Sequence, residues 1–208
     1  MPRRVRHLAI VAAVLSSLVG TLSATEALGL ASLDEQREAA ADSAARLSFM
    51  ADPEVTEALT RAQVSALLGM KAPRAVVLGT LALACLFAFT SALRLVRSGD
   101  LPLEGLRRIL SGSLLIAAFL RTIDGAMMAA VAQKMGKAAA PLMLKSHPEA
   151  AAMEGGAEAL MESIPTFMLL GVAGTTALIS GGFLLLGQYF RSEKVKEALA
   201  LLDVERGG

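Results

Sequence analysis

The sequence predicts an all-α integral membrane protein, a helical bundle of four transmembrane helices joined by helical extracytoplasmic loops. The first observation is composition: 54% of the 208 residues are hydrophobic and the mean hydropathy is +0.57, which is high for a soluble domain of this length. The second is clustering, because residues 75–93 and residues 163–190 contain no charge. A helix of roughly 20 residues crosses a hydrocarbon core of about 30 Å. Both blocks are therefore predicted to span the membrane.

The N-terminal segment predicts a first span over residues 7–28. Three arginines, Arg3, Arg4 and Arg6, precede an uncharged run that reaches residue 25. A basic start followed by an apolar stretch fits either a cleaved signal peptide or a retained signal anchor. The length of the run is close to the spanning minimum and favours the retained helix.

Charge distribution supports a third span over residues 109–133, although this segment contains Arg121 and Asp124. With a cytoplasmic N-terminus, the arginines and lysines of the cytoplasmic segments all lie near span ends, as the positive-inside rule requires. The outer segments between the spans, with Arg74 counted among them, carry eight basic and eleven acidic residues. We therefore expect four spans, at residues 7–28, 75–96, 109–133 and 164–190, with both termini on the cytoplasmic side of the cell inner (plasma) membrane. An excess of arginine over lysine is compatible with a bacterial source.

The first outer loop, residues 31–73, has helix signals. A capping box begins at Ser32, and a second helix is predicted to start with Asp52 as N-cap and Pro53 at the first helical position. Gly69 is a stop signal for that helix. The loop is therefore predicted to consist of helices.

The second outer loop, residues 134–163, begins with lysines and turns acidic. Breaks are expected at Pro141, at Pro148 and at the pair Gly155 and Gly156. Complementary halves on either side of a turn predict a helical hairpin that extends the third and fourth spans outward. Its row of glutamates is typical of a solvated face rather than of a cation site.

Residues 191–208 predict a cytoplasmic amphipathic helix whose apolar positions align on one face: Val195, Leu199 and Leu202. Such a helix lies at the inner membrane surface or docks on a partner. No repeat and no Pro- or Ser-rich linker divides the chain, so residues 1–208 are predicted to form a single membrane domain.

Arg121 and Asp124 are the main candidates for a functional site. They lie three residues apart on one helix face near the middle of the third span, so each can neutralise the other. Hydroxyl groups at comparable depth complete a candidate intramembrane polar cluster; they belong to Thr80, Thr175, Thr176 and Ser180. The pair either fixes helix registration or lines a path in which Asp124 carries a proton or cation. A single pair makes a poor relay, which favours the structural role.

Small residues recur every four positions on three spans, a pattern that lets helices approach closely in lipid. The rows are Thr80, Ala84, Ala88 and Ala92; Ala118, Thr122, Ala126 and Ala130; and Ala173, Ala177 and Gly181. They fit contacts within one chain or between chains.

Motifs for catalysis, metal binding or a cofactor are not found. His7 and His147 have no neighbours at zinc-ligand spacing, and the single Cys85 lies in an apolar span. The net charge of +1 does not indicate the excess of basic residues that is typical of a nucleic-acid-binding protein. We expect a non-enzymatic subunit or scaffold of a larger membrane assembly, with itself or other membrane proteins as partners in the lipid bilayer. The alternative is a small transporter or channel with Arg121 and Asp124 lining the path.

Overall fold

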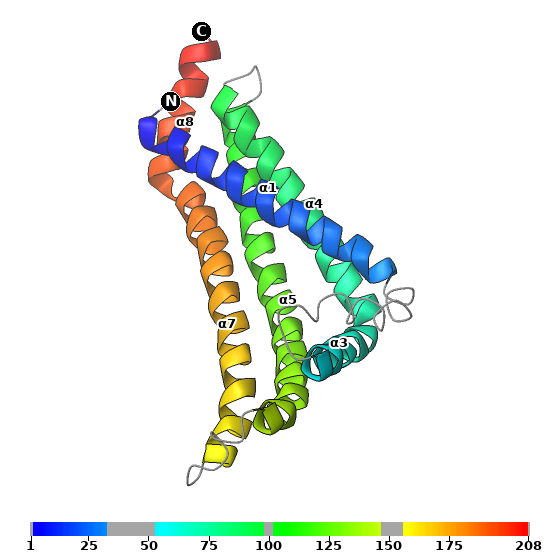
Figure 1. The fold of residues 1–208 in the computed structure, drawn as a ribbon. Coiled ribbons are helices and arrows are strands. Elements are labelled where there is room, and N and C mark those ends of the chain that lie inside the picture. Colours follow the sequence, from blue (N-terminus) through cyan, green and yellow to red (C-terminus); the bar gives the residue numbers. More distant parts are fainter. Residues whose placement is uncertain (1, 33–52, 98–101, 147–155, 208) are drawn as a thin grey trace. The chain divides into compact units, whose positions relative to one another are not determined.

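The computed structural model describes residues 2–32, 53–97, 102–146 and 156–207, and within these ranges it contains helices and no strand (Figure 1). The helices are α1 (Arg3–Ala31), α3 (Pro53–Leu68), α4 (Lys71–Arg97), α5 (Leu103–Ser146), α7 (Gly156–Arg191) and α8 (Glu193–Gly207). The prediction of an all-α fold is confirmed for this part of the chain.

Four of the helices, α1, α4, α5 and α7, are long and apolar enough to cross a membrane. Each contains one of the spans predicted from the sequence. At 1.5 Å per residue, the 44 residues of α5 extend over about 66 Å and the 36 residues of α7 over about 54 Å. Because about 30 Å crosses a hydrocarbon core, both helices are longer than a span requires.

Helix α3 begins and ends where its sequence signals predict. Pro53 is its first residue, where the missing backbone N–H costs nothing, and Leu68 is its last residue before Gly69. The predicted N-cap Asp52 and the helix expected after Ser32 lie outside the described residues, as does Pro148. Gly156, the second glycine of the predicted break, is the first residue of α7.

The predicted break at Pro141 is wrong, because α5 continues through this residue to Ser146. A proline inside a helix removes one backbone hydrogen bond and crowds the preceding turn. The two residues before it, Ala139 and Ala140, are buried. Their packing supports the helix across the position where one bond is missing.

The chain divides into two compact units, and the prediction of a single membrane domain stays a prediction. The first unit comprises Met1–Ala27, Val76–Ile123 and Ala177–Gly208. Its core contains alanines of α1 and α4, among them Ala9, Ala12, Ala88 and Ala92, together with Phe183 and Phe190 of α7. Small side chains on two helices let the backbones pack closely. Such packing matters in lipid, where the hydrophobic effect does not drive helices together.

Helix α8 belongs to this first unit, and its apolar face is covered by the unit's own core. Val195 and Leu199 are buried in the core, and Leu202 packs against it. This face is therefore not available to the inner membrane surface or to a partner, the two locations expected from the sequence. The opposite side of α8 exposes Leu201 and Val204.

The second unit comprises Leu28–Ala75 and Asp124–Thr176. Within it, α5 and α7 approach closely at Gly136 and Pro165: a Cβ atom added at Gly136 would lie 2.5 Å from the Cα of Pro165. Only a residue without a side chain fits at this position, because the obstructing atoms belong to the backbone. Buried side chains elsewhere in the unit include Leu30, Ala66, Leu67 and Val131.

The small-residue rows have different surroundings. Ala84, Ala88 and Ala92 of α4 are all buried, as close helix packing requires. On α5 only Ala118 is buried, whereas Thr122, Ala126 and Ala130 are exposed. On α7 both alanines of the row, Ala173 and Ala177, are exposed.

Candidate intramembrane polar site

Asp124 of α5 is completely buried and forms an ion pair with Arg74 of α4. The Nε of Arg74 donates a hydrogen bond to Oδ1 of Asp124 at 3.0 Å. The Arg74 side chain is 6% exposed and the Asp124 side chain 0%. Both residues belong to the second unit. An isolated charge within a bilayer is costly, and an opposite charge at hydrogen-bond distance offsets much of that cost.

Arg74 is positioned by the first turn of α4, which begins at Lys71. Its backbone N–H bonds the carbonyl of Met70 at 2.9 Å, so the helical turn is established before the apolar segment starts. The guanidinium is permanently charged and requires acceptors wherever water is excluded. Asp124 is such an acceptor.

The residue after Asp124 is Gly125, which makes the closest approach to α7 near this carboxylate. A Cβ atom at Gly125 would collide with the side chain of Thr176, including its Oγ1 at 2.5 Å. Thr176 is itself buried. Glycine at residue 125 thus lets the two helices pack tightly beside the ion pair.

The six residues of the predicted cluster are divided between the two units. Asp124, Thr175 and Thr176 belong to the second unit, and the other three, Thr80, Arg121 and Ser180, belong to the first. The cluster as a whole therefore stays a prediction, and so does the pairing of Arg121 with Asp124.

Two of the predicted hydroxyl groups bond to their own helices. Thr80 donates to the carbonyl of Val76 at 2.8 Å, and Thr175 donates to the carbonyls of Gly171 and Val172 at 3.0 Å. Such back-bonding is ordinary for threonine in a helix.

Ser180 has a partner on another helix. Its hydroxyl lies 3.2 Å from that of Thr122 on α5. This contact links α5 and α7 within the first unit.

Sequence reasoning missed Arg74, although one signal was present. It stands directly before the uncharged run of residues 75–93 and outside the predicted span of residues 75–96. A carboxylate within a span requires a cation, and a long arginine side chain at the end of a neighbouring span reaches inward. The i, i+3 spacing points instead to Arg121, because this spacing is visible without knowing the fold.

A second polar cluster ties helix ends together in the first unit, and the sequence did not predict it. Arg107 of α5 donates to both carboxylate oxygens of Glu104, at 2.7 and 2.8 Å, and to the carbonyl of Phe190 at 2.7 Å. The carboxylate of Asp203 accepts hydrogen bonds from the backbone N–H groups of Leu103, at 3.1 Å, and Glu104, at 3.4 Å.

These bonds satisfy polar groups that helices leave open at their ends. Asp203 of α8 and Glu104 place negative charge at the N-terminus of α5, and Arg107 places positive charge at the C-terminus of α7. Both arrangements complement the helix dipoles. The cluster therefore holds the ends of three helices in one arrangement.

The described residues contain no group of three or more His, Cys, Asp or Glu side chains that could hold a metal ion. Chemically, the Arg74–Asp124 pair offers one carboxylate able to exchange a proton and one permanent cation. Comparison with protein-family models, with curated proteins and with solved structures finds no match to this chain.

Proposed function

We propose that the protein is a non-enzymatic multi-pass protein of the inner membrane that serves as a subunit or scaffold of a larger assembly. In this proposal both termini are cytoplasmic, and the partners are further copies of the chain or other membrane proteins. The bilayer surrounds the remaining apolar surface.

The uncovered face of α7 carries this proposal. Only 11% of the most apolar 18-residue stretch of α7 is buried, whereas 33% to 39% of the corresponding stretch is buried in the other three candidate spans. Ala173 and Ala177 are exposed there. Small side chains make poor lipid contacts but let a second helix approach closely. This face therefore fits another protein helix.

A second stripe on α7 provides a matched control, because its large side chains suit lipid. It consists of exposed Phe167, Leu178 and Leu185. Added bulk at the small-residue face should block a partner helix, whereas added bulk on this stripe only displaces lipid.

The test compares two double variants extracted from native membranes in mild detergent. Ala173→Leu with Ala177→Leu is expected to give a smaller particle than wild type. Leu178→Phe with Leu185→Phe is expected to leave the particle unchanged. Particle mass by native mass spectrometry is the readout, and an unchanged mass in the alanine variant would contradict the proposal.

The alternative is a small transporter or channel with Arg121 and Asp124 lining the path. It is favoured by one observation, a fully buried carboxylate on a candidate span. One observation disfavours the transport hypothesis: Asp124 already forms an ion pair with the buried Arg74. A carboxylate held in such a pair transfers protons poorly. Proton and cation flux into liposomes decides between the two: if Asp124→Asn retains all the flux of an active parent, the transport hypothesis loses its basis.

A further inference from the structure

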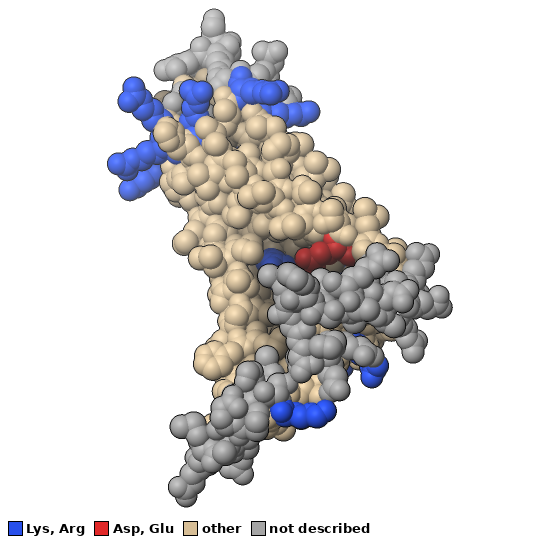
Figure 2. Space-filling model, in the orientation of Figure 1, with Lys and Arg blue, Asp and Glu red and all other residues tan. Residues whose placement is uncertain are grey.

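Basic side chains gather at one end of the first unit, over the region where α1 begins (Figure 2). They come from the start of α1, the end of α4, the start of α5, the end of α7 and from α8. The exposed ones are Arg3, Arg4, Arg6, Arg94, Arg97, Arg108, Arg191, Lys194 and Lys196. A concentration of cations at the ends of apolar helices favours contact with anionic lipid headgroups.

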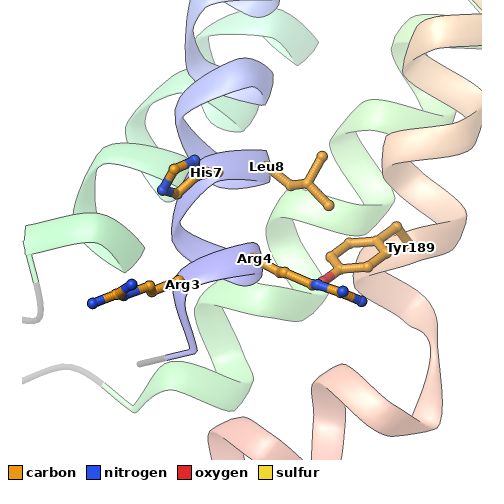
Figure 3. Close-up of a pocket in the computed structure, with 5 residues that line it drawn as sticks. All are labelled: Arg3, Arg4, His7, Leu8 and Tyr189. Atoms are coloured by element: carbon orange, nitrogen blue, oxygen red, sulfur yellow. The ribbon is translucent and has the colours of Figure 1, made fainter.

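Within this end lies an open pocket of about 480 Å³ between the start of α1 and the end of α7. It is lined by Arg3, Arg4, His7, Leu8 and Tyr189. Arg4 and Leu8 extend toward the Tyr189 ring, whereas Arg3 and His7 project from α1 away from that ring (Figure 3). The pocket thus combines cationic groups with an apolar wall.

The polar side chains of the pocket have hydrogen-bonding groups to spare. Among the described residues, the side chains of Arg3, Arg4 and His7 make no ion pair or hydrogen bond. Each guanidinium offers five N–H donors in a planar fork that matches phosphate oxygens. The first N–H groups of α1, at the positive end of its dipole, lie on the same turn.

The apolar wall distinguishes this pocket from a simple anion site. Leu8 and Tyr189 are half-buried, and the Tyr189 ring packs edge to face on Phe190, with ring centroids 5.5 Å apart. Tyr189 is the only tyrosine of the chain and lies at the end of the last span, the depth at which amphipathic rings meet the headgroup region.

We propose that this pocket binds an anionic phospholipid from the leaflet at this end. Arg4, which extends beside Tyr189, contacts the phosphate, and Arg3 adds positive charge at the edge of the pocket. Leu8 and Tyr189 contact the glycerol and the first acyl carbons. A free phosphate ion presents the same oxygens to the arginines but nothing that the apolar wall would bind, so the geometry favours the lipid as the source.

The test measures lipid binding to the full-length protein in detergent by native mass spectrometry. Phosphatidylglycerol is expected to bind at least about tenfold more tightly than phosphatidylcholine. At roughly fivefold per arginine near a membrane surface, Arg3→Gln with Arg4→Gln is expected to weaken phosphatidylglycerol binding by about 25-fold. The control, Arg94→Gln with Arg97→Gln, removes the same charge from the same end but outside the pocket, and should change binding less than about threefold.

Three outcomes would overturn the proposal. Equal losses in both double variants would indicate diffuse charge attraction instead of a site. Displacement of phosphatidylglycerol by an equal concentration of inorganic phosphate would make the free ion the ligand. A mature chain lacking Arg3 and Arg4, detected by intact mass in the same sample, would remove the site. None of these outcomes bears on whether the protein forms an assembly.

Discussion

Arg74 and Asp124 form an ion pair between α4 and α5, with Nε and Oδ1 3.0 Å apart and both side chains buried. The contact joins residues fifty positions apart in the sequence. It neutralises a carboxylate on a candidate span by means of a cation from the start of another helix. The pair therefore gives the second unit a specific polar contact in addition to apolar packing.

Removal of one partner should be more damaging than removal of both. We predict that Arg74→Met lowers the free energy of unfolding by about 3–5 kcal/mol, because Asp124 is left buried without this cation. Arg74→Met combined with Asp124→Leu should recover most of the loss. Equilibrium unfolding in mixed detergent micelles measures both values.

The matched control for this cycle is Arg94→Met, since Arg94 lies at the exposed C-terminal end of the same helix. It should change the free energy of unfolding by no more than about 0.5 kcal/mol. If Arg74→Met is as mild as the control, the ion pair does not stabilise the fold.

Gly136→Ala should destabilise the second unit. Its new Cβ atom would meet the backbone of Pro165, which cannot rotate away, so α5 and α7 would have to separate. We expect a loss of about 1–3 kcal/mol, the usual cost of overpacking. Gly79→Ala is the control because a Cβ atom there meets nothing within 4 Å. Equal thermal stability of the two variants would contradict the close approach.

Asp203→Ala should loosen the contact between α8 and the start of α5. The variant loses the acceptor for two backbone N–H groups, with an expected cost of about 0.5–2 kcal/mol. Asp203→Asn keeps an acceptor oxygen and should remain near wild type. Protease cleavage of α8, followed over time, reports the effect; identical rates for both variants would rule out capping.

The proposed orientation is tested by cysteine labelling in a Cys85→Ala background. Lys137 and Lys194 are both exposed, on α5 and α8 respectively. Lys137→Cys should react with a membrane-impermeant maleimide in intact cells. Lys194→Cys should react only after permeabilisation. The reverse pattern would show that the termini are outside.

Much of the fold could be predicted because helix-forming signals are local. Uncharged runs indicate three of the four long helices, and the charge distribution indicates the third span despite Arg121 and Asp124. Pro53 and Gly69 mark the ends of α3. The break predicted at Pro141 is wrong because the low helix propensity of proline takes no account of packing. The buried Ala139 and Ala140 lie immediately before it in α5.

The candidate site could be predicted only in part, because its decisive contacts join distant segments. Asp124 stands out in the sequence as a charge within a span, but its partner Arg74 is revealed only when α4 and α5 pack together. Asp203 likewise lies about a hundred residues from the helix end that it caps. The row of small residues on α7 is visible in the sequence, but its spacing does not show that Ala173 and Ala177 stay exposed.

The most direct test of the account is the mass of the wild-type particle extracted from native membranes in mild detergent. We predict a defined complex that contains more than one 21.6 kDa chain, or one chain with stoichiometric membrane-protein partners. A homogeneous particle containing a single chain and only lipid and detergent would contradict the assembly role.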